Sequence, residues 1–201
     1  MGKGADTREL IEHRALALAS SVGLGGLTIG KLAADVGMSK SGVFAHFSSK
    51  ENLHLAVLER YNNIYLYDIW GPALRAPRGR PRMEALLDRW LACLHSERLP
   101  GGCLFRATSS EFDDLDPPIR ERMGALLREW EKGLHRAAHA AIDAGHFRSD
   151  IDIPQFIFET ESLFQGYHHF KRLFALHDAE ERLRRGFIGL LDRAGDPSIR
   201  Q

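Results

Sequence analysis

Residues 27–47 read Leu-Thr-Ile-Gly-Lys-Leu-Ala-Ala-Asp-Val-Gly-Met-Ser-Lys-Ser-Gly-Val-Phe-Ala-His-Phe, and they predict two short helices separated by a glycine turn. Thr28 can cap the first helix, in which apolar residues recur at i, i+3, i+4 and i+7 counted from Ile29. That spacing places these residues on one buried face. Gly37 ends the helix, and Ser39 can cap the second one.

The second predicted helix has an inward and an outward face. Val43 and Phe47 stand four residues apart, so both point inward. Lys40, Ser41 and Phe44 face away from them. A short helix with a small, polar and cationic outer face suits the major groove of DNA. The two helices therefore predict a helix-turn-helix unit, with a helical hairpin of no DNA function as the alternative.

A third helix is expected directly after this unit. Residues 48–51 have the Ser-x-x-Glu form of a capping box, in which Ser48 would be the cap. The helical pattern continues to Trp70, where Gly71 and Pro72 are expected to end the helix.

These residues fall where the TetR family of bacterial regulators has its DNA-binding signature. The matching positions are Thr28, Leu32-Ala33, Val36-Gly37, Met38-Ser39-Lys40, Phe44-Ala-His46-Phe47 and Ser49-Lys50-Glu51. The chain therefore resembles the TetR family over about residues 8–60, and further along only its length and helical layout are similar. Phe44 stands where tyrosine is common in the family. If the hydroxyl of that tyrosine meets a phosphate, this chain lacks the hydrogen bond.

The resemblance implies an all-α protein of about nine helices. Residues 1–50 would form a three-helix DNA-binding domain, and residues 51–201 a ligand-binding and dimerisation domain. The resemblance further implies a repressor that binds a near-palindromic operator as a homodimer and leaves it when a small molecule binds. The residues expected at the DNA are Thr28, Lys40, Ser41, Gly42, Phe44, His46 and Lys50.

The charge balance indicates that any DNA-binding surface is local. The 201 residues carry 27 Lys plus Arg and 27 Asp plus Glu, so the chain as a whole is neutral. Between residues 28 and 50, three lysines stand against one aspartate. We call residues 1–50, the expected DNA-binding domain, the head of the chain. Because one such weakly basic head offers little affinity for DNA, we expect two heads to bind together.

Cysteine usage and hydropathy indicate the compartment. Cys93 and Cys103 form no disulfide framework, which favours a reducing environment. No apolar run is long enough to span a membrane, and the N-terminus lacks the apolar core of a signal peptide. We therefore expect a soluble cytoplasmic protein without a membrane partner or a cofactor.

Catalytic and metal-binding patterns are weak in this sequence. Nucleophile, phosphate-loop and dinucleotide motifs are not found, so an enzyme is the second hypothesis and a helical scaffold the third. His135 and His139 have a metal-compatible spacing but no third ligand, and no metal site is expected. Cys103 begins an expected helix, where a thiolate would be stabilised, although a buried apolar role is favoured. Helix capping explains the acidic cluster better than Ca²⁺ binding; its members are Glu111, Asp113, Asp114 and Asp116.

In the expected ligand-binding and dimerisation domain, residues 51–201, which we call the body, the sequence predicts five further helices after a proline-rich loop at residues 71–82. The aromatic residues of the body are expected to line a pocket for an aromatic or amphipathic effector. Glu161, Gln165 and His168 follow i, i+4 and i+7, so they form a polar stripe that either orients the ligand or faces solvent. The expected pocket residues are Trp90, Phe105, Ser109, Phe112, Met123, Trp130, Phe158, Glu161, Phe164, Gln165 and His168.

The last two expected helices are candidates for the dimer interface. Their apolar residues would pack against a second copy as a four-helix bundle across a two-fold axis. Alternatively, the same residues are core within one chain. They are Phe170, Leu173, Phe174, Phe187 and Leu191.

Overall fold

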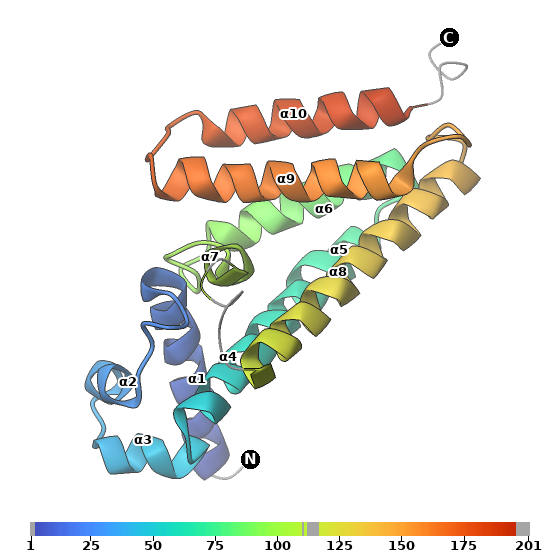
Figure 1. The fold of residues 1–201 in the computed structure, drawn as a ribbon. Helices are drawn as coiled ribbons and strands as arrows, with labels where there is room; N and C mark the ends of the chain where they lie inside the picture. Colours follow the sequence, from blue (N-terminus) through green and yellow to red (C-terminus); the bar gives the residue numbers. More distant parts are fainter. Residues whose placement is uncertain (1–2, 110, 112–116, 196–201) are drawn as a thin grey trace. The chain divides into compact units, whose positions relative to one another are not determined.

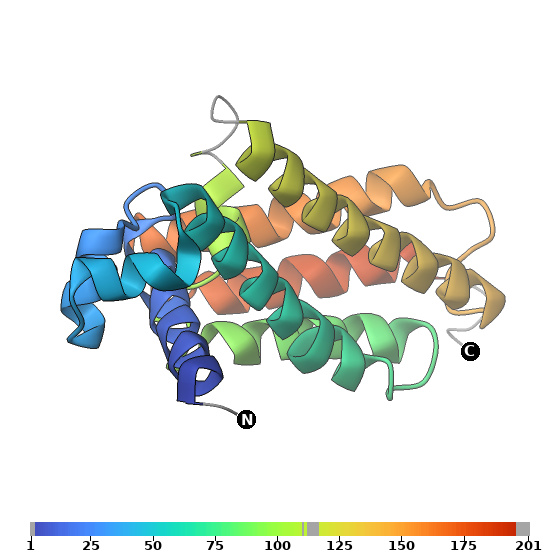
Figure 2. The same cartoon turned by 90° about the horizontal axis from the view of Figure 1, so that it is seen from below.

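The computed structural model describes residues 3–109, 111 and 117–195, without the side chains of residues 3 and 109. The described residues form helices joined by short turns, as Figures 1 and 2 show. The helices are α1 (Lys3–Val22), α2 (Ile29–Val36), α3 (Lys40–Phe47), α4 (Lys50–Ile64), α5 (Gly71–Ala73), α6 (Arg80–Leu94), α7 (Leu104–Ser109), α8 (Pro117–Asp143), α9 (Ile153–Arg172) and α10 (Ala179–Ala194). In these ranges the β-structure is a single isolated bridge between Phe147 and Gly195. The predicted all-α fold class is therefore confirmed, and the short α5 is an addition to the expected helices.

The helical run after α4 differs in detail from the expectation. The α-helix ends at Ile64, and residues Tyr65–Trp70 continue as a π-helix, in which the hydrogen bonds have a wider register. Gly71 and Pro72 do not stop the run, because both lie in α5, where proline at a first helical position is tolerated. The following helix α6 begins at Arg80, three residues before Met83, so the expected loop at 71–82 is shorter.

The chain divides into two compact units. The first contains residues 1–65 and 93–126, and the second contains residues 66–92 and 127–201. The units do not coincide with the functional division at residue 50, which stays a prediction. Among the helices that the structure describes, none is long and apolar enough to cross a membrane.

The core of the first unit is formed where α1, α2, α3 and α4 meet. Ile11, Leu16, Leu32, Val43 and Leu53 are among its fully or almost fully buried side chains. α1 contacts α2 and α4, and α3 contacts α2 and α4. These contacts hold the two short helices on a scaffold of longer ones.

The core of the second unit is aromatic. The rings of Trp90 and Phe164 stack with centroids 4.5 Å apart and an interplanar angle of 13°. Phe187 of α10 packs against Phe164 at 6.0 Å. α9 and α10 run antiparallel and side by side (Figure 1). Such ring contacts contribute beyond the apolar area that they bury.

Candidate functional site

The structure builds α2 and α3 with the caps that the sequence predicts. The hydroxyl of Thr28 accepts a hydrogen bond from the N–H of Lys31 at 3.2 Å. Gly37 has a φ of 67°, the left-handed conformation that ends α2. The hydroxyl of Ser39 accepts from the N–H of Gly42 at 3.0 Å and so begins α3. The two predicted helices and their glycine turn are confirmed.

The predicted faces of α3 are also confirmed. Val43 and Phe47 are buried, with 0% and 2% of their surface exposed. Lys40 and Ser41 are exposed, and 52% of the surface of Phe44 is exposed. An exposed phenylalanine between polar neighbours leaves an apolar edge for a partner to contact.

The start of α4 corrects the expected capping box. The cap is Ser49, whose hydroxyl accepts from the N–H of Asn52 at 3.0 Å. Ser48 instead ends α3 with a φ of 65°, and its N–H donates to the carbonyl of Phe44 at 2.7 Å. Because Ser48 takes this left-handed conformation, it has no extended backbone with which to cap the next helix.

The other expected DNA residues border α2 and α3. Thr28, Gly42 and His46 are half-buried, and Lys50 is exposed. The ammonium group of Lys50 donates to the carbonyl of Gly25 at 3.3 Å, and this partner is neutral.

Two arginines of α1 hold the pair of helices, and sequence reasoning missed both. Arg8 donates to the carbonyl of His46 at 2.8 Å, and its guanidinium lies 5.2 Å from the centroid of the Phe47 ring. Arg14 binds both carboxylate oxygens of Asp35, at 2.8 and 2.9 Å. Spacing along the chain gives no signal for such contacts, because the partners are 38 and 21 residues apart.

The expected pocket residues lie in both units. Phe105 and Met123 belong to the first unit and are buried, with 1% and 5% exposed. The second unit contains Trp90, Trp130, Phe158, Glu161, Phe164, Gln165 and His168. Phe112 lies outside the described residues, as does the side chain of Ser109.

In the second unit the structure joins two of these residues directly. The indole nitrogen of Trp130 donates to a carboxylate oxygen of Glu161 at 2.8 Å. Gln165 and His168 are half-buried, as Glu161 is, and extend the polar stripe along α9. Trp90 and Phe164 are buried against each other instead, so they form core.

Cys103 lies in a buried cluster of the first unit. None of its surface is exposed, and its sulfur lies 3.4 Å from the hydroxyl of Tyr65. Burial, followed by the neighbouring Cys103 and Tyr65, raises the pKa of Tyr61 well above its ordinary value. Among the described residues, no cluster of three or more His, Cys, Asp or Glu side chains is arranged to hold a metal ion.

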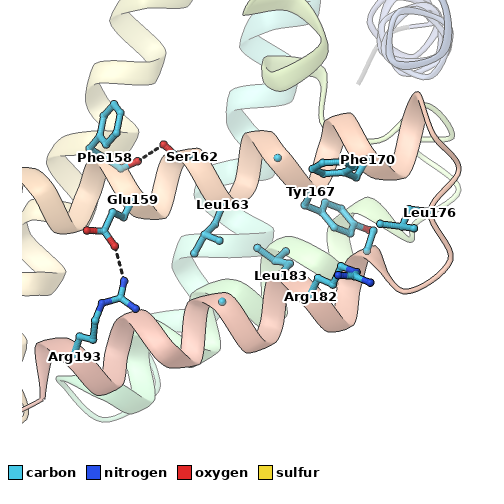
Figure 3. Close-up of a pocket in the computed structure, with 13 residues that line it drawn as sticks. Phe158, Glu159, Ser162, Leu163, Tyr167, Phe170, Leu176, Arg182, Leu183 and Arg193 are labelled. Carbon is cyan, nitrogen blue, oxygen red and sulfur yellow. Dashed lines mark hydrogen bonds and ion pairs between the residues drawn. The ribbon is translucent and has the colours of Figure 1, made fainter.

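A groove of about 530 Å³ runs along α9 and α10. Figure 3 shows Phe158 and Phe170 on α9, and Leu183 on α10, among its lining residues. The side chains of Glu159 and Arg193 form an ion pair across it at 2.5 Å. The lining also includes the small residues Ser162 and Gly166 on α9 and Gly186 on α10.

Comparison with known proteins agrees with this architecture. A family model described as "Tetracyclin repressor-like, C-terminal domain" matches residues 79–187, more than half of the chain. A model described as "Bacterial regulatory proteins, tetR family" matches residues 11–57. The chain belongs to the TetR family. It is therefore a DNA-binding transcriptional regulator and not an enzyme.

Several solved structures share the fold over almost the whole chain. A TetR transcriptional regulator from Chloroflexus aurantiacus is 26% identical, with 96% of each chain covered and a TM-score of 0.83. A regulator from Saccharomonospora viridis in complex with choline is 19% identical, with 94% of this chain and 96% of that chain covered and a TM-score of 0.80. AibR, in complex with isovaleryl coenzyme A and operator DNA, is 18% identical, with 91% and 96% covered and a TM-score of 0.69. The last two likenesses concern the fold alone. None of the curated proteins matches the sequence significantly.

Proposed function

We propose that this TetR-family protein is a ligand-responsive repressor that binds a near-palindromic operator as a homodimer. The observation that carries the proposal is the outer face of α3, where Lys40 and Ser41 are exposed beside the half-exposed Phe44. A helix held from behind by Val43 and Phe47 can enter the major groove without rearranging its own core.

The DNA contacts are proposed to divide into two kinds. Lys40, Ser41 and Phe44 meet base edges or the adjacent backbone, with Gly42 allowing close approach. Thr28, His46 and Lys50 contact phosphates, partly together with the N–H groups at helix starts. Such phosphate contacts set the position of the head, whereas the contacts of α3 select the sequence.

The homodimer is proposed to form through exposed apolar residues of α9 and the turn after it. Phe170, Leu173 and Phe174 are 48%, 69% and 61% exposed, and Phe170 also lines the groove between α9 and α10. Phe187 and Leu191 are 1% and 0% exposed, so they belong to the core of the protomer. The expectation that these two residues lie in the dimer interface is therefore wrong. A second copy of the two helices would complete a four-helix bundle.

The effector is proposed to bind in the body, with Trp130, Glu161, Gln165 and His168 near its polar end. Glu161 and the indole of Trp130 already form one hydrogen-bonded unit, which gives the site a fixed acceptor. The relatives solved with choline and with isovaleryl coenzyme A support a small-molecule effector of this class of regulator. Binding that favours one arrangement of the body would change the separation of the two heads and release the operator.

The DNA proposal is tested on an operator selected from random duplexes with the wild-type protein. Lys50→Ala should weaken binding to operator and to unrelated duplex alike, and should lower the slope of log affinity against log salt by about one. Lys132→Ala removes a lysine that is paired with Glu129 at 2.7 Å outside this region, and it serves as the control. An unchanged affinity and slope for Lys50→Ala would remove Lys50 from the interface.

The effector proposal is tested by screening small molecules for release of the same operator. Gln165→Ala and Glu161→Gln should raise the concentration of the releasing compound that is needed, without changing operator affinity in its absence. If both variants respond as wild type does, the pocket lies elsewhere. If no compound releases a verified operator complex, the protein is not a ligand-controlled repressor.

A further inference from the structure

The turn between α1 and α2, residues 23–27, is held by side chains bound to its backbone. Three of them come from α2 and α4. Lys31 donates to the carbonyl of Gly26 at 3.0 Å, and Lys50 donates to the carbonyl of Gly25 at 3.3 Å. The imidazole of His54 lies 3.2 Å from the carbonyl of Leu27. One of the side chains bound to the turn, Lys50, is therefore also a proposed phosphate-binding residue.

A fourth side chain reaches the turn from a distant part of the sequence. A carboxylate oxygen of Glu111 accepts a hydrogen bond from the N–H of Gly25 at 3.1 Å, across 86 residues. This contact corrects the expectation that Glu111 caps a helix. Hydrogen bonds to a charged acceptor are stronger than those between neutral groups, so this contact can hold the turn.

The turn makes room for the carboxylate with a glycine. Gly23 has a φ of 78°, and a Cβ at this position would lie 2.1 Å from a carboxylate oxygen of Glu111. Any side chain at position 23 would displace Glu111, in addition to the strain of the left-handed conformation. The carboxylate of Glu111 therefore packs directly against the backbone of the turn.

Gly101, which precedes α7 and Glu111 in the sequence, contacts α1. The N–H of Gly101 donates to the hydroxyl of Ser20 at 3.1 Å, and a Cβ on Gly101 would lie 1.5 Å from the carbonyl oxygen of Ser20. Between these attachments, Phe105 of α7 packs edge-on against Tyr61 of α4 with centroids 4.7 Å apart. A shift of α7 would therefore be passed to the end of α1 and to the turn.

We propose that Glu111 is a positioning residue for DNA binding, which fixes the α1–α2 turn and thereby places Lys50 and the start of α2. Glu111 holds the N–H of Gly25 while Lys50 holds the carbonyl of the same residue. Glu111 and Gly25 both belong to the first unit, so the contact joins its residues 93–126 to its helix-turn-helix region. The role of Lys50 in this inference rests on the proposed function, but the effect of Glu111 on the operator needs no effector.

The test compares Glu111→Ala with Glu111→Gln in the full chain. Both variants remove a negative charge, whereas only glutamine keeps an oxygen that can accept from Gly25. Operator affinity of Glu111→Gln should stay within about twofold of wild type, and that of Glu111→Ala should fall about fivefold or more below Glu111→Gln. Affinity for an unrelated duplex should also be lower for Glu111→Ala than for Glu111→Gln, because the phosphate contact proposed for Lys50 does not depend on sequence.

Hydrogen exchange at the Gly25 amide provides a second measurement in the free protein. It should speed up in Glu111→Ala and stay slow in Glu111→Gln. Equal operator affinities of the two variants would overturn the inference, whether or not the exchange changes. Unchanged exchange in a folded Glu111→Ala protein would show that the contact is not made and would overturn it too. A failure of Lys50→Ala to lower the salt slope would count only against the phosphate contact of Lys50.

Discussion

Trp130 and Glu161 form a hydrogen bond of 2.8 Å between α8 and α9, with the indole N–H as donor and the carboxylate as acceptor. Only 3% of the Trp130 surface is exposed, while Glu161 is half-buried. The bond places a charged acceptor at the edge of an aromatic core, where Trp70 also packs against Trp130 with centroids 5.1 Å apart.

Removing the acceptor should destabilise the second unit. We expect Glu161→Ala to lower the free energy of unfolding by about 1–2 kcal/mol, because a hydrogen bond with a charged group is lost near a buried ring. Glu161→Gln keeps an acceptor and should lose less than half as much. Urea unfolding monitored by tryptophan fluorescence measures both. Equal losses in the two variants would show that the charge, and not the hydrogen bond, matters.

Two phenylalanines of α3 should separate folding from DNA binding. Phe47→Ala removes a ring that is 2% exposed and should cost about 3–4 kcal/mol of unfolding free energy. Phe44→Ala removes a ring that is 52% exposed, so its stability should change by less than about 0.5 kcal/mol. Its operator affinity should nevertheless fall about tenfold, since an apolar base or backbone contact is lost.

Phe44→Tyr is the matched variant for this position. It keeps the ring and adds the hydroxyl that is common in the family, so it should bind the operator at least as tightly as wild type. Thermal melting gives the stabilities, and fluorescence anisotropy with labelled operator gives the affinities. Wild-type operator affinity of Phe44→Ala would place Phe44 outside the interface.

Local features of the helix-turn-helix could be predicted from the sequence, because they depend on neighbours. The caps at Thr28 and Ser39, the turn at Gly37 and the inward pair of Val43 and Phe47 involve residues at most four positions apart. The choice between Ser48 and Ser49 as cap could not be made, since both are serine and the backbone conformation decides.

Contacts between distant residues gave no such signal. Glu111 reads as one of several acidic residues near a proline, and its hydrogen bond to Gly25 follows only from the fold. The apolar spacing of α10 likewise identified one face, but not what covers it. Phe187 and Leu191 on that face are covered within the chain, whereas Leu173 and Phe174 stay exposed.

The pH dependence of stability should report on His54, which lies behind the α1–α2 turn. Burial lowers the pKa of His54, with a smaller contribution from Lys50 and an opposing one from the hydrogen bond to Leu27. The unfolded chain, in which histidine titrates at about 6.5, therefore binds more protons than the folded chain below that pH. Stability is greatest above this value and falls as the pH decreases toward the lower pKa of the folded state.

His54→Gln should flatten this loss, since glutamine can still donate to the carbonyl of Leu27 and does not titrate. Urea unfolding at pH 7.5 and at pH values from 6.5 down to 5 measures the slope, and His139→Gln provides an exposed histidine as control. Burial also lowers the pKa of His13, so some slope should remain. A slope equal to that of wild type would assign the acid sensitivity to other groups.

Charge substitutions at Leu173, which follows α9, and at Leu191 of α10 should distinguish the proposed dimer interface from the core of the protomer. Leu173→Glu places a carboxylate at a position that is 69% exposed in the protomer, so the single chain should fold with little loss of secondary structure. If Leu173 packs against a second copy, burying that carboxylate is costly and the dimer should dissociate in sedimentation at micromolar concentration. Tyr67→Glu, at a position that is 73% exposed outside the proposed interface, should leave the assembly unchanged.

Leu191→Glu should behave differently, because Leu191 is fully buried within the protomer. A charge there should unfold the second unit rather than produce a folded monomer.

A folded Leu173→Glu monomer should keep weak binding to DNA, because each head carries only a few basic side chains. It should lose the preference for a two-half-site operator, because half-site spacing is read by two heads. A Leu173→Glu protein that stays dimeric would exclude Leu173 from the interface. A monomeric wild-type protein that still prefers the palindrome would contradict the homodimer itself.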